Sequence, residues 1–249
     1  METERKILVI SRHGKTPNGE DGLSLDSLLP ESVNSLYEKA RAELGDETAA
    51  YNILPHASFL RHSDKVRTLN TGRSILAGIF GFEPKPEREE DLEESPHFRR
   101  IETAEDEMLS YENLKFNEDA IITLGLPQYI ERWFAQPDAT KYEGVEITPF
   151  NELLRTRRPC LADAVRILVR NKDIGVLGTH ASIADALTMI AVNSARKTPV
   201  TSFDEIGGQF EKEDFATLRV DYNPKSQIYE ARLSRKEQDY KVDIGELLN

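Results

Sequence analysis

Residues Lys6 to Ser11 read Lys-Ile-Leu-Val-Ile-Ser, and the chain continues directly into Arg12-His13-Gly14. A short apolar run rich in β-branched residues is typical of a strand that is buried on both faces. In open α/β sheets, ligands bind at the edge formed by the carboxyl ends of such strands. Gly14 has no Cβ, so the backbone can turn sharply there or approach a ligand closely. The junction therefore predicts a buried strand that delivers a guanidinium and an imidazole to a ligand-binding edge.

Length, composition and charge indicate which classes of protein the chain can belong to. The chain has 249 residues, 39% of them hydrophobic, and its single cysteine, Cys160, excludes an internal disulfide. No apolar run approaches the roughly 20 residues that span a bilayer, and no signal peptide precedes the first strand, so we expect a cytoplasmic protein without membrane contact. The net charge of −12 argues against nucleic acid as a partner. A phosphate site in this chain would need a local cluster of basic residues.

Apolar patterns of helical and strand type alternate along the sequence. They predict helices at 30–44, 64–80, 126–135, 150–170 and 182–195, and strands at 6–11, 57–62, 173–178, 215–220 and 227–233. We expect an α/β three-layer sandwich, with a mostly parallel central sheet and helices on both faces, in a single domain over residues 1–249. Pro159 is expected to break or start a helix. Residues 83–107, rich in Asp and Glu, are expected to form a solvated surface excursion, with a lid over the substrate as the alternative.

A basic cluster follows the second predicted strand. Four basic residues lie between positions 61 and 73, against one acid, Asp64. We expect Ser63 to cap the helix at 64–80 and Arg67 to point back toward the sheet edge. A helix N-terminus adds a partial positive charge and N–H groups, which also favour an anion. The alternative is a charged, solvated helix face.

A second histidine stands in the same kind of position as His13. The strand at 173–178 is followed by Thr179 and His180 and then by a helix, in which Ser182 and Asp185 have the spacing of a capping pair. If both strands lie centrally in one parallel sheet, two histidines and two arginines meet at its edge. A neutral imidazole is a nucleophile at pH 7, and guanidinium groups bind phosphate oxygens with forked donors.

The ordered set of motifs resembles the histidine phosphatase superfamily, which includes the cofactor-dependent phosphoglycerate mutases. The set consists of R-H-G after the first strand, S-x-x-x-R-x-x-x-T at the start of a helix, and G-T-H before a late helix, and it covers residues 7 to about 186. The resemblance implies hydrolysis of phosphomonoesters without a metal or cofactor. It implies that His13 becomes phosphorylated, that Arg12 and Arg67 bind the phosphoryl group, and that His180 stabilises this group during transfer.

The loop after Gly14 supplies further expected contacts to the substrate. By resemblance, Thr16 or Asn18 donates a hydrogen bond to the phosphate, and Lys15 adds positive charge beside it. The mutases typically continue R-H-G-E-S-x-W-N, whereas this chain continues Lys-Thr-Pro-Asn18. The sequence therefore favours a phosphatase over a mutase.

The general acid departs from the family pattern. The usual Glu follows a leucine as L-x-E, but after Leu109 that position is occupied by Tyr111. Glu112 is the nearest substitute and Glu107 the next, and we expect Glu112 to protonate the leaving group. Because some family members lack this acid and act on phosphohistidine in proteins, the expected partner is a small phosphorylated substrate or a phosphoprotein.

Two alternatives from other classes remain at this point. A catalytically weak phosphate-binding or scaffolding protein on the same fold is compatible with the displaced acid. A metal hydrolase would have to use His56, His62, His97 and His180, but no H-E-x-x-H or H-x-H pattern accompanies them. The sequence leaves the physiological substrate and the oligomeric state open.

Overall fold

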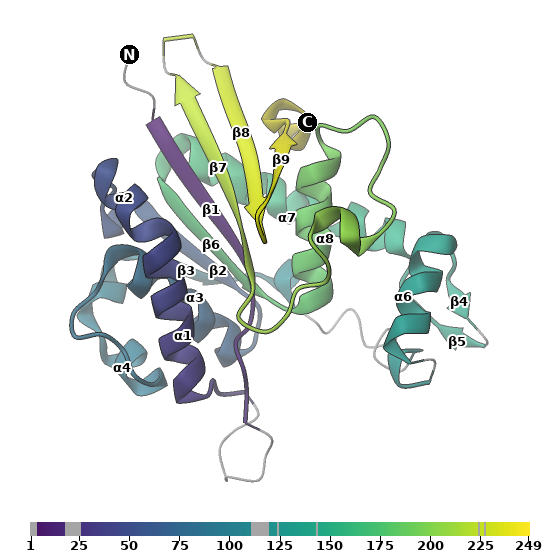
Figure 1. Ribbon diagram of the computed structural model, residues 1–249, viewed down its shortest axis with the longest axis horizontal. Helices are drawn as coiled ribbons and strands as arrows, with labels where there is room; N and C mark the ends of the chain where they lie inside the picture. The colour runs from purple at the N-terminus through teal and green to yellow at the C-terminus, as the bar shows by residue number, and fades with distance from the viewer. Residues whose placement is uncertain are drawn as a thin grey trace.

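The computed structural model describes residues 4–17, 26–110, 120–123, 125–142, 144–223, 225–226 and 228–249. Its centre is a sheet of seven strands in the order β3-β2-β6-β1-β7-β8-β9, with helices on both faces (Figure 1). The strands are β1 (Glu4–Arg12), β2 (Ser58–His62), β3 (Glu102–Glu105), β6 (Ile174–Thr179), β7 (Phe215–Asn223), β8 (Ile228–Arg235) and β9 (Gln238–Val242).

The strands β3, β2, β6 and β1 are parallel, and β7, β8 and β9 then alternate in direction. The predicted α/β class with a largely parallel centre is thus confirmed. The register places Arg12 of β1 opposite Thr179 of β6, and Gly178 of β6 opposite His62 of β2. Three parallel strands therefore end side by side at one edge of the sheet.

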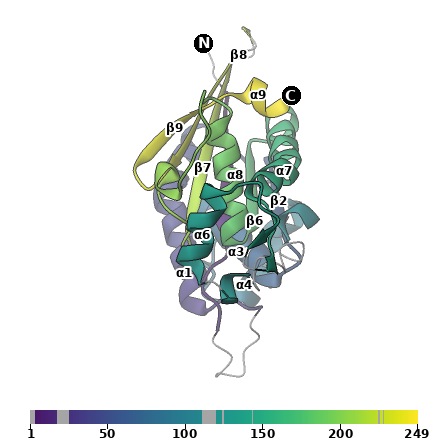
Figure 2. The ribbon, with the colours of Figure 1, turned by 90° about the vertical axis from the view of Figure 1, so that its right-hand side faces the viewer.

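Helices form the two outer layers, as Figures 1 and 2 show. The first four lie on one face of the sheet and α7, α8 and α9 on the other, while α6 and a small hairpin, β4–β5, project to the side. Their bounds are α1 (Pro30–Ala40), α2 (Asp46–Ala50), α3 (Val66–Phe80), α4 (Glu89–Glu94), α6 (Leu126–Ala135), α7 (Phe150–Asn171), α8 (Ala181–Asn193), α9 (Ile244–Leu248), β4 (Lys141–Tyr142) and β5 (Val145–Glu146).

The continuous apolar run of β1 fills two separate cores. Ile7 and Val9 pack on the side of α1 and α3, whereas Leu8 and Ile10 pack on the side of α7 and α8. All four side chains are fully buried. Because successive side chains of a strand point to opposite faces, a strand covered on both faces has to be apolar at every position.

Three local expectations were wrong. The helix α3 begins at Val66, with Lys65 at the capping position, while the Ser63 hydroxyl bonds to the Thr68 hydroxyl and accepts from the Lys65 N–H. Pro159 lies inside α7, where the burial of one face of a 22-residue helix outweighs the loss of a single hydrogen bond.

The third error concerns the start of α8. This helix begins at Ala181 with His180 at the capping position. Asp185 does not cap it but accepts a hydrogen bond from the backbone of Phe210.

The acidic stretch at 83–107 is only partly a solvated surface excursion, because parts of it belong to the sheet and to the core. Its last part, β3, is the edge strand of the sheet and pairs in parallel with β2. Leu92 and Ile101 are buried in the core on the α3 side, while most of the acidic side chains are exposed. This stretch is therefore anchored to the sheet at two apolar points and by one strand.

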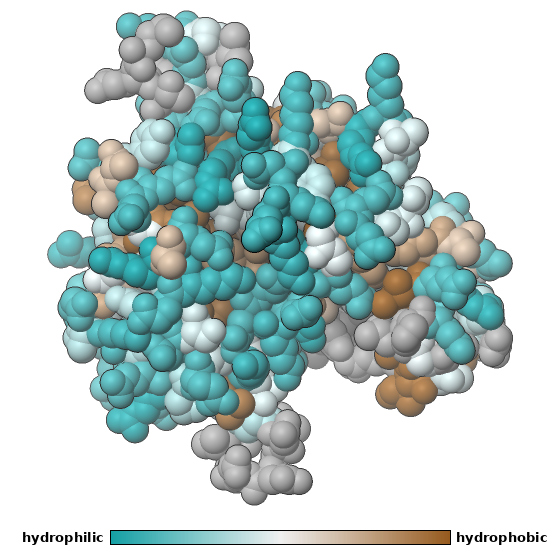
Figure 3. Space-filling model, in the orientation of Figure 1, coloured by the Kyte–Doolittle hydropathy of each residue, from teal (hydrophilic) through white to brown (hydrophobic). Residues whose placement is uncertain are grey.

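Most of the face shown in Figure 3 is polar, and apolar surface gathers over the projecting part that carries α6. Ile122, just before that helix, is 82% exposed. Within the described ranges, no helix combines the length and apolarity required to cross a membrane.

Candidate functional site

The two histidines of the sequence motifs meet where β1 and β6 end. The His13 backbone N–H donates to the Thr179 carbonyl at 2.9 Å, which continues the strand pairing by one residue. The imidazole rings of His13 and His180 lie edge to face, with their centroids 5.3 Å apart and an angle of 69° between their planes. Both residues are almost completely buried. The structure thus brings together two residues that are far apart in the sequence.

One nitrogen of His13 is assigned by its hydrogen bond. The Nδ1 atom lies 2.8 Å from the Gly14 carbonyl oxygen, which can only accept, so Nδ1 carries the proton. In the neutral ring the lone pair is then on Nε2. Burial, with the charges of Arg67 and Arg12, lowers the pKa of His13 from 6.5 to about 4, although the Gly14 bond opposes the change. His13 is therefore neutral at pH 7, with a nucleophilic Nε2.

The His180 ring is oriented by Ser63 at the end of β2. The Nε2 atom of His180 is 3.1 Å from the Ser63 hydroxyl, which also lies 2.9 Å from the Thr68 hydroxyl and accepts from the Lys65 backbone N–H. Burial and the neighbouring His13 and Arg67 lower the pKa of His180 to about 3. The serine of the S-x-x-x-R-x-x-x-T motif therefore links the start of α3 to the second histidine.

Arg12 is held by the segment that precedes β7. Its Nη1 donates to the Phe210 carbonyl at 2.7 Å, and the Phe210 N–H donates to the buried carboxylate of Asp185 at 2.9 Å. Burial raises the pKa of Asp185 to about 7. The buried guanidinium of Arg235 bonds to Asp214 at 2.8 Å and to three carbonyls of the same segment. The buried side chains of Asp185 and Arg235 thus fix the peptide that orients Arg12.

Arg67 lies in the first turn of α3, and its charge acts on both histidines. The Thr71 hydroxyl, one turn later, donates to the Arg67 carbonyl at 2.8 Å and accepts from the Gly14 N–H at 3.0 Å. The threonine that ends the motif therefore attaches the R-H-G turn to α3.

Of the remaining residues expected to contact the substrate, some are described by the structure and others are not. The Lys15 side chain is 53% exposed, with its ammonium 3.8 Å from Glu213, and Thr16 is half-buried. Asn18 and Glu112 lie outside the described residues. Glu107 is exposed in a 3-10 turn, Glu107–Leu109.

Sequence reasoning missed Asp185, Arg235 and Lys212. The charge of Lys212, on the segment before β7, also lowers the pKa of His13. None of the three belongs to a motif of the ordered set. The one signal in the sequence is that Asp185 is an acidic residue within an otherwise apolar helix.

The other histidines are dispersed. His62 bonds through Nδ1 to the Ser63 carbonyl at 2.6 Å, His97 stacks on Phe82 at 4.2 Å, and His56 lies in the turn at the opposite end of β2. Across the described part of the chain, no three His, Cys, Asp or Glu side chains converge as metal ligands would.

Comparisons with known proteins agree with this architecture. No family model and no curated protein matches the sequence. Among solved structures, a mycobacterial hydrolase has a TM-score of 0.53 at 16% identity over 99% of this chain and 96% of its own. A mycobacterial glucosyl-3-phosphoglycerate phosphatase gives 0.52 at 15% identity over 93% and 98%, and its complex with inorganic phosphate gives 0.51 at 16% identity over 94% and 97%. The chain therefore has the fold of the histidine phosphatase superfamily.

Proposed function

We propose that the protein is a phosphomonoester hydrolase that works through a phosphohistidine on His13. The observation that carries this proposal is the buried, neutral imidazole whose Nδ1 is bonded to the Gly14 carbonyl, so that Nε2 is the nucleophile. Arg12 and Arg67 supply permanent positive charge beside it. These are the groups that phosphoryl transfer requires, because its charge spreads over the equatorial oxygens.

Two displacements make up the reaction. The Nε2 lone pair of His13 attacks phosphorus, and the P–O bond to the alcohol breaks with its electron pair leaving on oxygen. That oxygen takes a proton, for which Glu112 is the proposed donor. Water then attacks the phosphorus of the phosphohistidine and gives a proton to the Glu112 carboxylate left by the first step, the P–N bond breaks, and the electron pair returns to Nε2. No metal takes part in either step of this proposal.

The other proposed contacts hold the phosphoryl group. Arg12 and Arg67 grip its oxygens with forked donors, and His180 donates an N–H to the oxygen that gains charge during transfer. Thr16, Asn18 and Lys15 complete the substrate-binding set. The fold of the mycobacterial glucosyl-3-phosphoglycerate phosphatase supports a small phosphorylated compound as the substrate class.

Hydrolysis of para-nitrophenyl phosphate by purified protein tests the proposal. We expect inorganic phosphate to be released, and His13→Asn to lower kcat by at least about a thousandfold. His62→Asn is the matched control, because His62 also ends a strand and also bonds through Nδ1 to the next carbonyl. Acid-labile phosphate on His13, found by mass spectrometry after rapid denaturation, would support the covalent step. Near-normal activity of His13→Asn would overturn it, and inactivity of the wild type would favour a phosphate-binding protein.

A further inference from the structure

Arg157, on α7, is a buried cation that has no hydrogen bond or ion pair among the residues that the structure describes. It is 4% exposed, its Nε has no hydrogen bond, and within the described part of the chain its guanidinium forms no ion pair. Burial lowers the pKa of Arg157, but a guanidinium remains protonated in proteins. A charge that is buried without a partner destabilises the folded protein, because burial removes its hydration. An anion bound to the Arg157 guanidinium in the functional state would compensate this buried charge.

The surroundings of Arg157 add positive charge. The Nε of Arg61, on β2, is also buried without a hydrogen bond, and the charges of Arg61 and Arg157 both act on Cys160. Burial and Asp106 raise the pKa of the Cys160 thiol, so it carries no charge at neutral pH. Asp106 is the acid that acts on Arg157, and it already accepts bonds from Met108 at 2.9 Å and Cys160 at 3.5 Å. The charges of two guanidiniums and one carboxylate thus act around Cys160.

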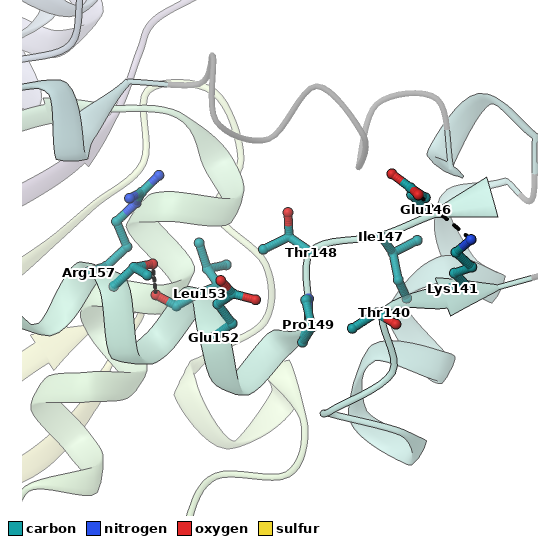
Figure 4. A pocket seen from close by; sticks show the side chains of 10 residues that line it. Thr140, Lys141, Glu146, Ile147, Thr148, Pro149, Glu152, Leu153 and Arg157 are labelled. Atoms are coloured by element: carbon teal, nitrogen blue, oxygen red, sulfur yellow. Dashed lines mark hydrogen bonds and ion pairs between the residues drawn. The ribbon is translucent and has the colours of Figure 1, made fainter.

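Arg157 lines a cavity of about 560 Å³ between the start of α7 and the β4–β5 hairpin. In Figure 4 the Arg157 side chain and the Thr148 hydroxyl extend to the same side of this cavity, above Leu153. The volume lies within the range of small-molecule sites. The cavity therefore has the size for an organic molecule and a cation at one end.

Each of the other charged side chains that line the cavity has an ion-pair partner. Lys141 lies 3.7 Å from Glu146 across the hairpin, and Glu152 lies 3.9 Å from Arg155 on α7. Among the described residues, Arg157 is therefore the charged side chain of the lining that has no ion pair. An acidic group of a ligand is consequently favoured over a basic one.

A short element links this cavity to the histidines. The turn Glu107–Leu109 begins after Asp106, whose charge acts on Arg157. At its other end the Leu109 carbonyl accepts a hydrogen bond from the Thr179 hydroxyl at 2.8 Å. Thr179 directly precedes His180. One end of this turn thus follows the acid that acts on Arg157, and the other end contacts the residue that precedes His180.

We propose that Arg157 forms a second anion-binding site, which takes a carboxylate or phosphate of a small molecule, and that this group is the distal acid of the substrate dephosphorylated at His13. The identity of the occupant rests on the proposed function, whereas the anion site does not. A free anion bound beside the substrate would have the same chemistry, and the experiment separates the two sources.

The first arm measures thermal unfolding in the presence of inorganic phosphate. Wild type, Arg157→Gln, Arg67→Gln and the double variant are compared, with the exposed Arg170→Gln on the same helix as the control. We expect each single variant to lose part of the phosphate-induced rise in Tm and the double variant to lose all of it. Without phosphate, Arg157→Gln should be at least as stable as wild type, because it removes an unpaired buried charge. A full phosphate response in Arg157→Gln, or a strong loss of stability without phosphate, would overturn the site.

The second arm identifies the occupant with two substrates that differ by one carboxylate, O-phosphoserine and O-phosphoethanolamine. We expect Arg157→Gln to lower kcat/KM for O-phosphoserine by about 10- to 100-fold, which corresponds to the loss of a hydrogen-bonded charge pair. The kcat/KM for O-phosphoethanolamine should stay within about twofold of the wild-type value. Arg157→Lys should restore part of the loss. Equal rates with both substrates, together with a lost phosphate site, would show that a separate anion is bound and refute the distal acid. If the wild type hydrolyses para-nitrophenyl phosphate but not O-phosphoserine, the distal acid is refuted; if it hydrolyses none of the three, the proposed function fails while the first arm still decides the anion site.

Discussion

The ionisation of His13 gives a direct test of the site. Its pKa is lowered to about 4 from an ordinary 6.5 by burial and by Arg67 and Arg12. At pH 5 an imidazole with a pKa of 6.5 is about 3% neutral, whereas one with a pKa of 4 is about 90% neutral. His13 should therefore show no titration between pH 8 and pH 5, and its proton should reside on Nδ1.

Long-range nitrogen–proton NMR of protein labelled with ¹⁵N-histidine measures both properties. The signals of His13 are those absent from His13→Asn, and His62→Asn serves as the assignment control. An imidazole assigned to His13 that titrates near pH 6.5, or that carries its proton on Nε2, would refute the reasoning from burial and from the Gly14 bond.

The same difference in pKa affects stability. Because the unfolded chain protonates His13 from pH 6.5 downward and the folded chain only near pH 4, stability decreases as the pH falls through this window, by up to about 3 kcal/mol. Urea unfolding at pH 7 and pH 5 should show a smaller acid loss for His13→Asn than for wild type. An equal loss in both proteins would contradict the lowered pKa.

Two further substitutions test how the site is supported. A Cβ on Gly178 would overlap the Thr68 carbonyl oxygen where α3 packs on β6, so Gly178→Ala should cost about 1–3 kcal/mol in urea unfolding, and a neutral result would contradict this close approach. Asp185→Ala leaves the Phe210 N–H buried without its acceptor and should cost about 1–3 kcal/mol, with weaker phosphate binding because Phe210 holds Arg12. Asp185→Asn keeps an acceptor and should stay near wild type in calorimetric titration with phosphate; equal defects in both variants would exclude the hydrogen bond as the cause.

The fold was predictable because its central strands carry strong signals. The run from Ile7 to Ile10 is apolar at every position, as a strand covered on both faces must be. The edge strand β3 was missed because its Glu-Thr-Ala-Glu sequence is mostly exposed and pairs through backbone groups alone. An edge strand of this kind leaves no periodic apolar pattern in the sequence.

The meeting of the two histidines was predictable from the sequence because both lie at strand ends, whereas contacts between distant segments were not. His13 and His180 meet because β1 and β6 pair in register, which the buried-strand pattern anticipates. The contact of Asp185 with Phe210 depends on how the segment before β7 packs on α8, and local spacing read Asp185 as a capping residue instead. The burial of Arg157 with no ion pair among the described residues likewise depends on tertiary packing, which a sequence pattern does not reveal.

The central place of β1 has a consequence for synthesis of the chain. This strand comes first in the sequence, yet both of its neighbours, β6 and β7, come late, and β7 ends only at Asn223. During translation, most of the polypeptide must be synthesised before the apolar residues from Ile7 to Ile10 can pair with a neighbouring strand on either side. Such long-range pairing slows folding and leaves an aggregation-prone segment uncovered. We therefore expect the nascent chain to depend on ribosome-associated chaperones, and no fragment that ends before β6 to contain both histidines of the site.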